Sequence, residues 1–224
     1  MALKLDRKLV EAAVREAVLA QLKGNPSAPA KGGAPGMVVH ASARHMHVTQ
    51  KDLETLFGPG ASLHIRKPLY QEGHFAAEEA VTMIGPRNRL ISGLRILGPV
   101  RDYTQVELAF TDAVTLGIDG VPVRNSGDIK GSAPAYVMGP AGMLEMKEGV
   151  IRASIHAHMN PREAAYYGVK DRELMKLLVR GSTSMIFDRL LVRVAEGMKL
   201  EVHLDTDEAN ACDLAHAKEI RLYR

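Results

Sequence analysis

From residue 37 onward the sequence is a succession of short β-type runs separated by glycine and proline, and this pattern restricts the fold. Runs such as "MVVHAS", "NRLISGLRIL" and "KLEVHLD" favour strands, and "LFGPGA" and "IGPRN" are turn signals between them. Helices are expected only near 50–57, 161–167 and 171–179, and "AVTLGI" is interpreted as a strand. Many short strands at this spacing favour β-barrels or sandwiches over a parallel sheet with alternating helices.

The first 36 residues differ from the rest. Residues 3–23 carry apolar side chains at helical spacing with charged residues mostly opposite, which predicts an amphipathic helix. Gly24 is suited to end this helix. Residues 25–36, "NPSAPAKGGAPG", predict a flexible linker. The tethered helix is either an address peptide or a helix that packs on its own domain or on a dimer partner, and periodicity does not choose between these. Its acidic residues argue against a mitochondrial transit peptide.

Length and composition exclude several classes of protein. The 224 residues suffice for one large or two small domains. The net charge of +3 is only mildly basic, and the absence of Trp with 4% aromatics disfavours a nucleic-acid partner. No apolar run approaches the ~20 residues of a membrane span, and no secretory signal is expected. The single Cys212 cannot form an internal disulfide, which is typical of a reducing cytosol.

Two stretches share one sequence device: "ASARHMHVTQKDLETLFG", residues 41–58, and "ASIHAHMNPREAAYYG", residues 153–168. Each contains Ala-Ser, then His-x-His, then a capping residue followed three positions later by an acid. Thr49 and Asn160 are the predicted N-caps. Each His-x-His is therefore predicted at the end of a strand, just before a short helix, with both rings on one face. The repetition suggests an internal duplication with two related sites.

Two imidazoles on one strand face can chelate a metal, but zinc takes three or four ligands. In "LEVHLD", His203 shares the polar face with Glu201, and in "RDYTQVELAF", Gln105 shares it with Glu107. His203 and Glu107 are therefore candidates for the further ligands. Imidazole and carboxylate ligands favour Zn²⁺, with Co²⁺, Ni²⁺ or Fe²⁺ as alternatives. Isolated histidines are solvated by default, so surface positions are expected for His40, His64, His74 and His216.

Basic residues suited to an anion accompany these clusters. Arg101 precedes Glu107 by six positions, so the two share a face if the strand is continuous. The planar guanidinium of arginine suits phosphate. The segment "RNSGDIKGS", residues 124–132, is rich in glycine but lacks the spacing of a nucleotide-binding P-loop. We interpret it as a turn-rich hairpin.

Together these motifs resemble those of the PduL-type phosphate propanoyltransferases, the phosphotransacylases of bacterial microcompartments. The resemblance rests on "SARHMH", "RILGPVRDYTQVE", "RNSGDIKGS", "RASIHAHM" and "EVHLDTDEAN", and it covers nearly everything from residue 37 onward. The N-terminal helix and linker are similar to encapsulation peptides, which place cargo inside a protein shell. The resemblance thus implies a cytoplasmic enzyme inside a microcompartment, with shell proteins as partners of its N-terminal helix. Whether it forms a homo-oligomer stays open.

The fold that the resemblance implies is mainly β with short helices, in two small β-barrels. Residues 1–24 would be the targeting helix and residues 25–36 the linker. Residues 37–46 with 155–224 would form the first, discontinuous barrel, and residues 47–154 the second. The implied reaction is reversible: propanoyl-CoA and inorganic phosphate give propanoyl phosphate, an acyl phosphate, and coenzyme A. The sequence leaves open whether acetyl-CoA is a substrate as well.

The resemblance also implies residues for two Zn²⁺ ions per chain. The first, beside the CoA sulfur, would be bound by His45, His47 and Glu107. The second would be bound by His156, His158 and His203. Arg101 matches the family's phosphate-contacting, catalytic arginine. The family's CoA contacts fall at Ser42, Lys67, Arg95, Leu97, His203 and Asn210. No protein nucleophile is required, so Cys212 is expected to be structural.

Three other readings compete with this one. A metal-dependent (thio)ester hydrolase uses similar ligand sets to activate water. A non-enzymatic metal-binding cargo adaptor would have closed four-ligand sites. A cupin-like oxygenase is disfavoured, because a helix cap follows each His-x-His where a cupin strand would continue.

Overall fold

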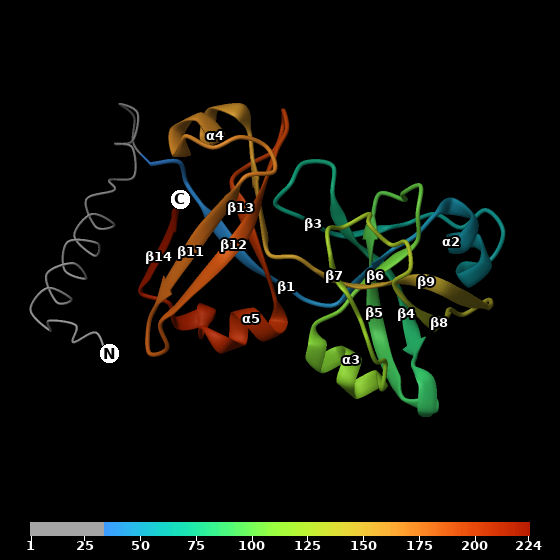
Figure 1. The fold of residues 1–224 in the computed structure, drawn as a ribbon. Coiled ribbons are helices and arrows are strands. Elements are labelled where there is room, and N and C mark those ends of the chain that lie inside the picture. Colours follow the sequence, from blue (N-terminus) through green and yellow to red (C-terminus); the bar gives the residue numbers. More distant parts are fainter. Residues whose placement is uncertain (1–33) are drawn as a thin grey trace, which may run out of the picture.

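The computed structural model describes residues 34–224, so the predicted targeting helix and nearly all of the linker lie outside the described residues. This part is mainly β, with two curled sheets side by side and short helices at their ends (Figure 1). The predicted fold class is thereby confirmed. Within these residues no helix is both long enough and apolar enough to cross a membrane.

Six strands form one sheet, which curls into a small barrel in the order β1-β13-β10-β12-β11-β14. Its strands are β1 (Val38–Ser42), β10 (His156–Met159), β11 (Leu174–Arg180), β12 (Met185–Val194), β13 (Glu201–Asp205) and β14 (Glu219–Tyr223). Helices α4 (Pro161–Tyr167) and α5 (Thr206–Ala211) accompany it, with a short 3₁₀ turn, η2 (Leu214–His216).

Eight strands form the other sheet, in the order β3-β4-β5-β2-β6-β9-β7, with β8 pairing with β4 and β9. These are β2 (His45–His47), β3 (Ile65–Pro68), β4 (Phe75–Ile84), β5 (Leu90–Gly98), β6 (Gln105–Glu107), β7 (Val123–Arg124), β8 (Ala133–Met138) and β9 (Met143–Ala153). Helices α2 (Gln50–Phe57) and α3 (Phe110–Leu116) and the 3₁₀ turn η1 (Pro86–Asn88) belong to this half.

Five strands of each sheet share one arrangement. The series β4-β5-β2-β6-β9 pairs antiparallel, parallel, antiparallel and parallel. The series β11-β12-β10-β13-β1 repeats the same four pairings. Helices follow at equivalent places, after β2 and β10 and again after β6 and β13. This common order supports the internal duplication predicted from the two His-x-His motifs.

The chain passes between the sheets twice. It leaves β1 at Ser42 and enters β2 at His45, and it leaves β9 at Ala153 and enters β10 at His156. The predicted domain boundaries stay a prediction, although Met46, which they place in the first barrel, is buried in the core of the eight-stranded sheet. Each crossover delivers the chain directly to a His-x-His strand.

Each sheet encloses its own apolar core. In the eight-stranded half, Met46, Leu53 and Leu94 are fully buried, and in the six-stranded half Leu177 and Val192 are. Burying a side chain of this size contributes about 1.5–3 kcal/mol to the free energy of unfolding, so the two cores hold the strands rigidly beneath the residues that face outward.

The predicted helix near 171–179 is wrong, because residues 174–180 form β11. Leucine, methionine and lysine favour helices in isolation. Here Met175, Leu177 and Val179 are buried on one face of a strand that pairs with β12 and β14 on either side. Tertiary pairing thus overrides the local preference.

Two further predictions fail in the eight-stranded half. "AVTLGI" is not a strand, because its first residues belong to α3, where the Asp112 carboxylate accepts a hydrogen bond from Ala109 N at 3.2 Å and so caps the helix. The segment 124–132 contains turns but is not a hairpin, because β7 pairs with β9 and not with β8. It is a loop that faces the other sheet.

Candidate active site

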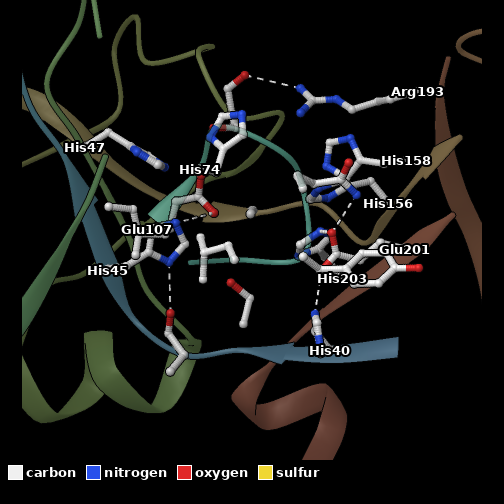
Figure 2. Close-up of a pocket in the computed structure, with 18 of the residues that line it drawn as sticks. His40, His45, His47, His74, Glu107, His156, His158, Arg193, Glu201 and His203 are labelled. Atoms are coloured by element: carbon white, nitrogen blue, oxygen red, sulfur yellow. Dashed lines mark hydrogen bonds and ion pairs between the residues drawn. The ribbon is translucent and has the colours of Figure 1, made fainter. Parts of the chain in front are cut away.

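A cavity of about 800 Å³ lies between the two sheets, and residues of both line it. Both His-x-His strands face this cavity, as Figure 2 shows. The strand ends that the sequence predicted as sites therefore meet in one place. The predicted caps are also present: Thr49 Oγ1 accepts from Asp52 N at 3.1 Å, and Asn160 Oδ1 accepts from Glu163 N at 3.0 Å.

The first cluster consists of His45 and His47 on β2 and Glu107 on β6. Glu107 is the antiparallel partner of His45, which places its carboxylate beside the two rings. The ring centroids of His45 and His47 are 5.0 Å apart, and His45 Nε2 is 3.5 Å from Glu107 Oε2. One ligand atom from each of the three residues lies within 4.8 Å of the others.

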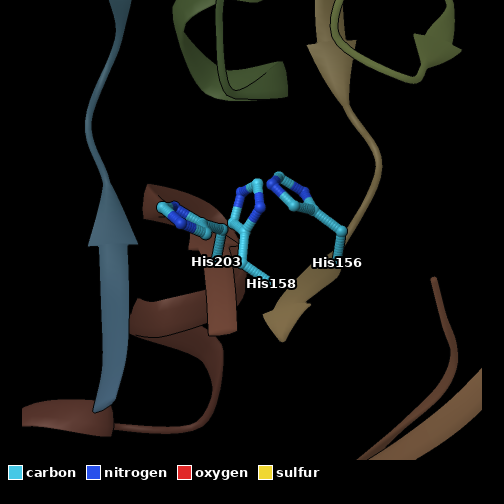
Figure 3. Close-up of side chains that lie close together, drawn as sticks. All are labelled: His156, His158 and His203. Carbon is cyan, nitrogen blue, oxygen red and sulfur yellow. The ribbon is translucent and has the colours of Figure 1, made fainter. Parts of the chain in front are cut away.

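The second cluster repeats this geometry with His156 and His158 on β10 and His203 on β13. His203 is the antiparallel partner of His156, just as Glu107 is of His45. The rings of His156 and His158 are again 5.0 Å apart, and those of His156 and His203 are stacked at 4.8 Å. The three rings converge in Figure 3, with ligand atoms within 4.8 Å of one another.

The crossovers between the sheets orient the first histidine of each pair. His45 Nδ1 lies 2.9 Å from the carbonyl of Ala43, and His156 Nδ1 lies 2.8 Å from the carbonyl of Ser154. A carbonyl accepts only from a protonated nitrogen, so this contact assigns the proton to Nδ1. The lone pair of Nε2 is then free to face its cluster, as in metal-binding histidines.

Burial keeps these side chains in the protonation states that a cation requires. Burial, with the nearby His45 and Arg101, lowers the pKa of His47 to about 3. Burial, with His156 and His203, lowers the pKa of His158 to about 3. Burial alone would raise the pKa of Glu107, but the imidazoles of His45 and His47 lower it below its usual value. Neutral imidazoles beside an ionised carboxylate are the forms that bind metals.

The donor sets fit zinc. His47 Nδ1 is buried and makes no hydrogen bond within the described residues, whereas His203 Nε2 lies 3.2 Å from Glu201 Oε2. Buried polar atoms are nearly always satisfied, so the unpartnered nitrogen of His47 indicates a ligand that binds at the first cluster. Each cluster offers three protein ligands, which is the number that catalytic zinc sites use while keeping one position for substrate.

The other predicted site residues are placed as follows. The cavity is lined by Ser42, Lys67, Arg95, Leu97, Arg101 and His203. Asn210 is exposed on α5 and is not among the residues that line the cavity. The assignment of these residues to CoA therefore stays a prediction, and Asn210 is the one member set apart from the rest.

Arg101 lines the cavity from the segment between β5 and β6. Its backbone N donates to Val48 O at 2.8 Å. Its Nη1 donates to Tyr103 Oη at 2.9 Å and to Ser126 Oγ at 3.3 Å. These contacts hold the guanidinium at the cavity without neutralising its charge.

Gln105 ties the first cluster to the loop that carries Ser126. This fully buried amide donates from Nε2 to Glu107 Oε1 at 2.7 Å and to Ser126 Oγ at 3.0 Å. Its Oε1 accepts from Gly127 N at 2.7 Å. The sequence placed Gln105 on the face of Glu107 but gave it no role.

Sequence reasoning overlooked two histidines and one arginine that line the cavity. All four isolated histidines are exposed, as predicted. His64 and His216 lie beside Glu79 and Asp213, and His40 and His74 line the cavity. His40 Nδ1 contacts the buried Glu201, whose other oxygen accepts from Gln71 Nε2 at 2.7 Å. Arg193 also lines the cavity. Only the pairing of distant strands reveals these positions.

The chain matches the family model for phosphate propanoyltransferase over residues 38–215. It is 46% identical to a phosphate propanoyltransferase of Planctopirus limnophila, over 98% of this chain and 92% of that protein. It is 50% identical to one of Thermotoga maritima, over 80% and 85% of the two chains. A third, from Salmonella typhimurium, is 38% identical over 95% and 96%. The chain therefore belongs to the phosphate propanoyltransferase family of phosphotransacylases.

Proposed function

We propose that this enzyme transfers a propanoyl group reversibly between coenzyme A and inorganic phosphate inside the cavity between the two sheets, using both clusters. The observation that carries this proposal is the meeting of two equivalent three-residue clusters with the guanidinium of Arg101 in one cavity. A thioester and a phosphate need such a shared site, because the reaction joins the two molecules directly.

We assign one zinc to each cluster, with His45, His47 and Glu107 holding the first and His156, His158 and His203 the second. Zinc at these positions would act as a Lewis acid toward the thioester carbonyl and would stabilise a thiolate. The role of the protein is to keep the imidazoles neutral and aimed, through burial and through the carbonyls of Ala43 and Ser154.

Arg101 binds the phosphate in this proposal. Its guanidinium presents donors in a planar fork that matches two phosphate oxygens. Holding the phosphate beside the thioester carbon replaces a bimolecular encounter by an oriented attack, which is worth a large part of the rate. A bond forms between a phosphate oxygen and the carbonyl carbon while the carbon–sulfur bond breaks. The proton of hydrogen phosphate ends on the CoA sulfur.

Direct transfer to phosphate requires no acyl-enzyme. Cys212 is fully buried in the core of the six-stranded sheet and does not line the cavity. Burial raises the pKa of its thiol, which disfavours the nucleophilic thiolate. The cavity residues Ser42, Lys67, Arg95, Leu97 and His203 are the proposed contacts of CoA.

The proposal extends to a second substrate and to the location of the enzyme. Acetyl-CoA lacks one methylene of propanoyl-CoA, a difference worth only about 1–3 kcal/mol in an apolar pocket, so we expect it to be used as well. We also propose that residues 1–24 attach the enzyme to the shell of a microcompartment. Deletion of these residues should leave activity intact and abolish co-purification with shell proteins, and retained shell association would refute this role.

The deciding experiment measures zinc content and CoA release from propanoyl-CoA, with and without phosphate. Wild-type protein should contain about two zincs per chain and release CoA only when phosphate is present. His156→Ala should lose the second zinc and the activity. His216→Ala is the matched control and should behave as wild type, because His216 is an exposed histidine that pairs with Asp213 and belongs to neither cluster nor to the cavity lining.

Two outcomes would contradict the proposal. Release of CoA at the same rate without phosphate would identify a metal-dependent hydrolase. Bound zinc without any turnover would favour a cargo adaptor.

A further inference from the structure

Arg193 lies on β12 of the six-stranded sheet, whereas Arg101 belongs to the eight-stranded half. It is the strand partner of His158, so its side chain emerges beside the second cluster. It is half-buried and lines the cavity, and in Figure 2 its guanidinium extends over the space between the clusters. Nothing in its own sequence neighbourhood, "LLVRVAEG", marks it as a functional residue.

Two arginines from opposite sheets meet at one residue. Arg193 Nη2 donates to the carbonyl oxygen of Ser126 at 3.3 Å, and Arg101 Nη1 donates to the hydroxyl of the same serine at 3.3 Å. Among residues 34–224, no ion pair within 4.0 Å involves either guanidinium. Neither of these two guanidiniums is thus paired directly with a carboxylate, although Glu107, Glu196 and Glu201 also line the cavity, and both can pair with an anionic ligand.

Most of the hydrogen-bonding capacity of both guanidiniums is also unused by the described residues. A guanidinium has five N–H donors. Arg101 bonds through Nη1 alone, and Arg193 bonds through Nη2 alone. Because Gln105 already holds the loop through Ser126 Oγ and Gly127 N, the loop does not depend on Arg193 for its position. The free donors of both arginines are therefore suited to a phosphate, which accepts bidentate hydrogen bonds from such forks.

We propose that Arg193 is a second phosphate-binding residue, which together with Arg101 holds between the two sheets the phosphate that accepts the propanoyl group. This inference rests on the proposed function, because it assigns a role in the same reaction. Inorganic phosphate and the phosphoryl group of propanoyl phosphate carry the same oxygens, so Arg193 contacts the substrate in both directions of the reaction. Coenzyme A does not depend on this contact.

The test compares Arg193→Gln, Arg193→Lys and Arg221→Gln. Arg221 is the control, because it lies on β14 of the same sheet and pairs with Glu219 in solvent. Steady-state kinetics give the KM values for phosphate, propanoyl phosphate and propanoyl-CoA, and calorimetry gives the binding of inorganic phosphate. Loss of a charged hydrogen-bond donor should raise both phosphate-dependent KM values about tenfold or more. The KM for propanoyl-CoA should stay within about twofold.

Arg193→Lys should restore part of the affinity for phosphate, because lysine supplies the positive charge without the planar pair of N–H donors. Unchanged KM values for phosphate in an active Arg193→Gln enzyme would overturn the assignment. Parallel increases in the KM values for phosphate and propanoyl-CoA, with loss of zinc, would also overturn it, because they would mean that Arg193 only supports the structure of the site. If wild type binds phosphate but transfers no acyl group, the proposed function fails, and calorimetry alone decides: loss of binding in Arg193→Gln supports Arg193 as a phosphate ligand, and retained binding overturns it.

Discussion

Replacement of Arg152 by alanine should destabilise the whole molecule, because this side chain joins the two halves. Arg152 lies on β9 of the eight-stranded sheet, and its Nε is 2.5 Å from Asp205 Oδ2 at the start of α5 in the other half. Its Nη2 also pairs with Glu208, and its guanidinium lies 4.7 Å from the centre of the Phe110 ring. The side chain of Arg152 is only 15% exposed, and those of both carboxylates are about as buried.

The magnitude follows from what the substitution leaves behind. Removing one partner of a buried ion pair costs about 3–5 kcal/mol, because the remaining charges stay buried without compensation. At about 2–4 °C per kcal/mol for a domain of this size, the Tm should fall by roughly 6–20 °C. Arg124→Ala removes a more exposed i,i+4 pair with Asp128 and should change the free energy of unfolding by no more than about 0.5 kcal/mol.

Urea denaturation followed by circular dichroism, at neutral pH and with matched zinc content, measures both variants against wild type. A loss below about 1 kcal/mol for Arg152→Ala would refute this reasoning, since it would mean that water or neighbouring groups satisfy the two carboxylates. An equal loss of unfolding free energy in Arg124→Ala would refute it as well, because the cost of removing an ion pair would then not depend on its exposure.

Three further predictions concern the site. Zinc-free protein should lose stability as the pH falls from 6.5 toward 3. The folded pKa values of His47 and His158 are about 3, below the unfolded value of 6.5, so over this range the unfolded state binds the extra protons. Urea denaturation in EDTA should show a loss of about 2 kcal/mol in the free energy of unfolding for each histidine at pH 5, and a free energy of unfolding that is independent of pH would contradict this. Glu107→Gln should lose one zinc and retain the other, which metal analysis of the purified variant checks against the His216→Ala control. Cys212→Ala should keep nearly all turnover and lose only some stability, and a folded variant without activity would disprove direct transfer to phosphate.

The local elements of the site were predictable because they depend on neighbouring residues. The N-caps Thr49 and Asn160 and the common face of each His-x-His follow from spacing alone. The pairing of His45 with Glu107 and of His156 with His203 was suggested by family resemblance, and the strand register provides its physical basis.

The remaining features depend on contacts between distant segments. Arg193 enters the cavity because β12 pairs with β10, and β11 is a strand because it lies between β12 and β14. No local pattern distinguishes "ELMKLLVRG" from a helix, since its residues have good helix propensity and only the neighbouring strands require the extended form.

The double passage of the chain between the sheets also sets the order in which the enzyme can assemble during synthesis. Every strand of the eight-stranded sheet has been made once residue 153 is reached, so this half and its cluster can form early. β1 precedes the other strands, and among residues 34–224 it pairs only with β13, near the other end of the chain. A nascent chain thus carries an unpaired strand edge until β13 is made, and a product truncated between them would be prone to aggregate through that edge.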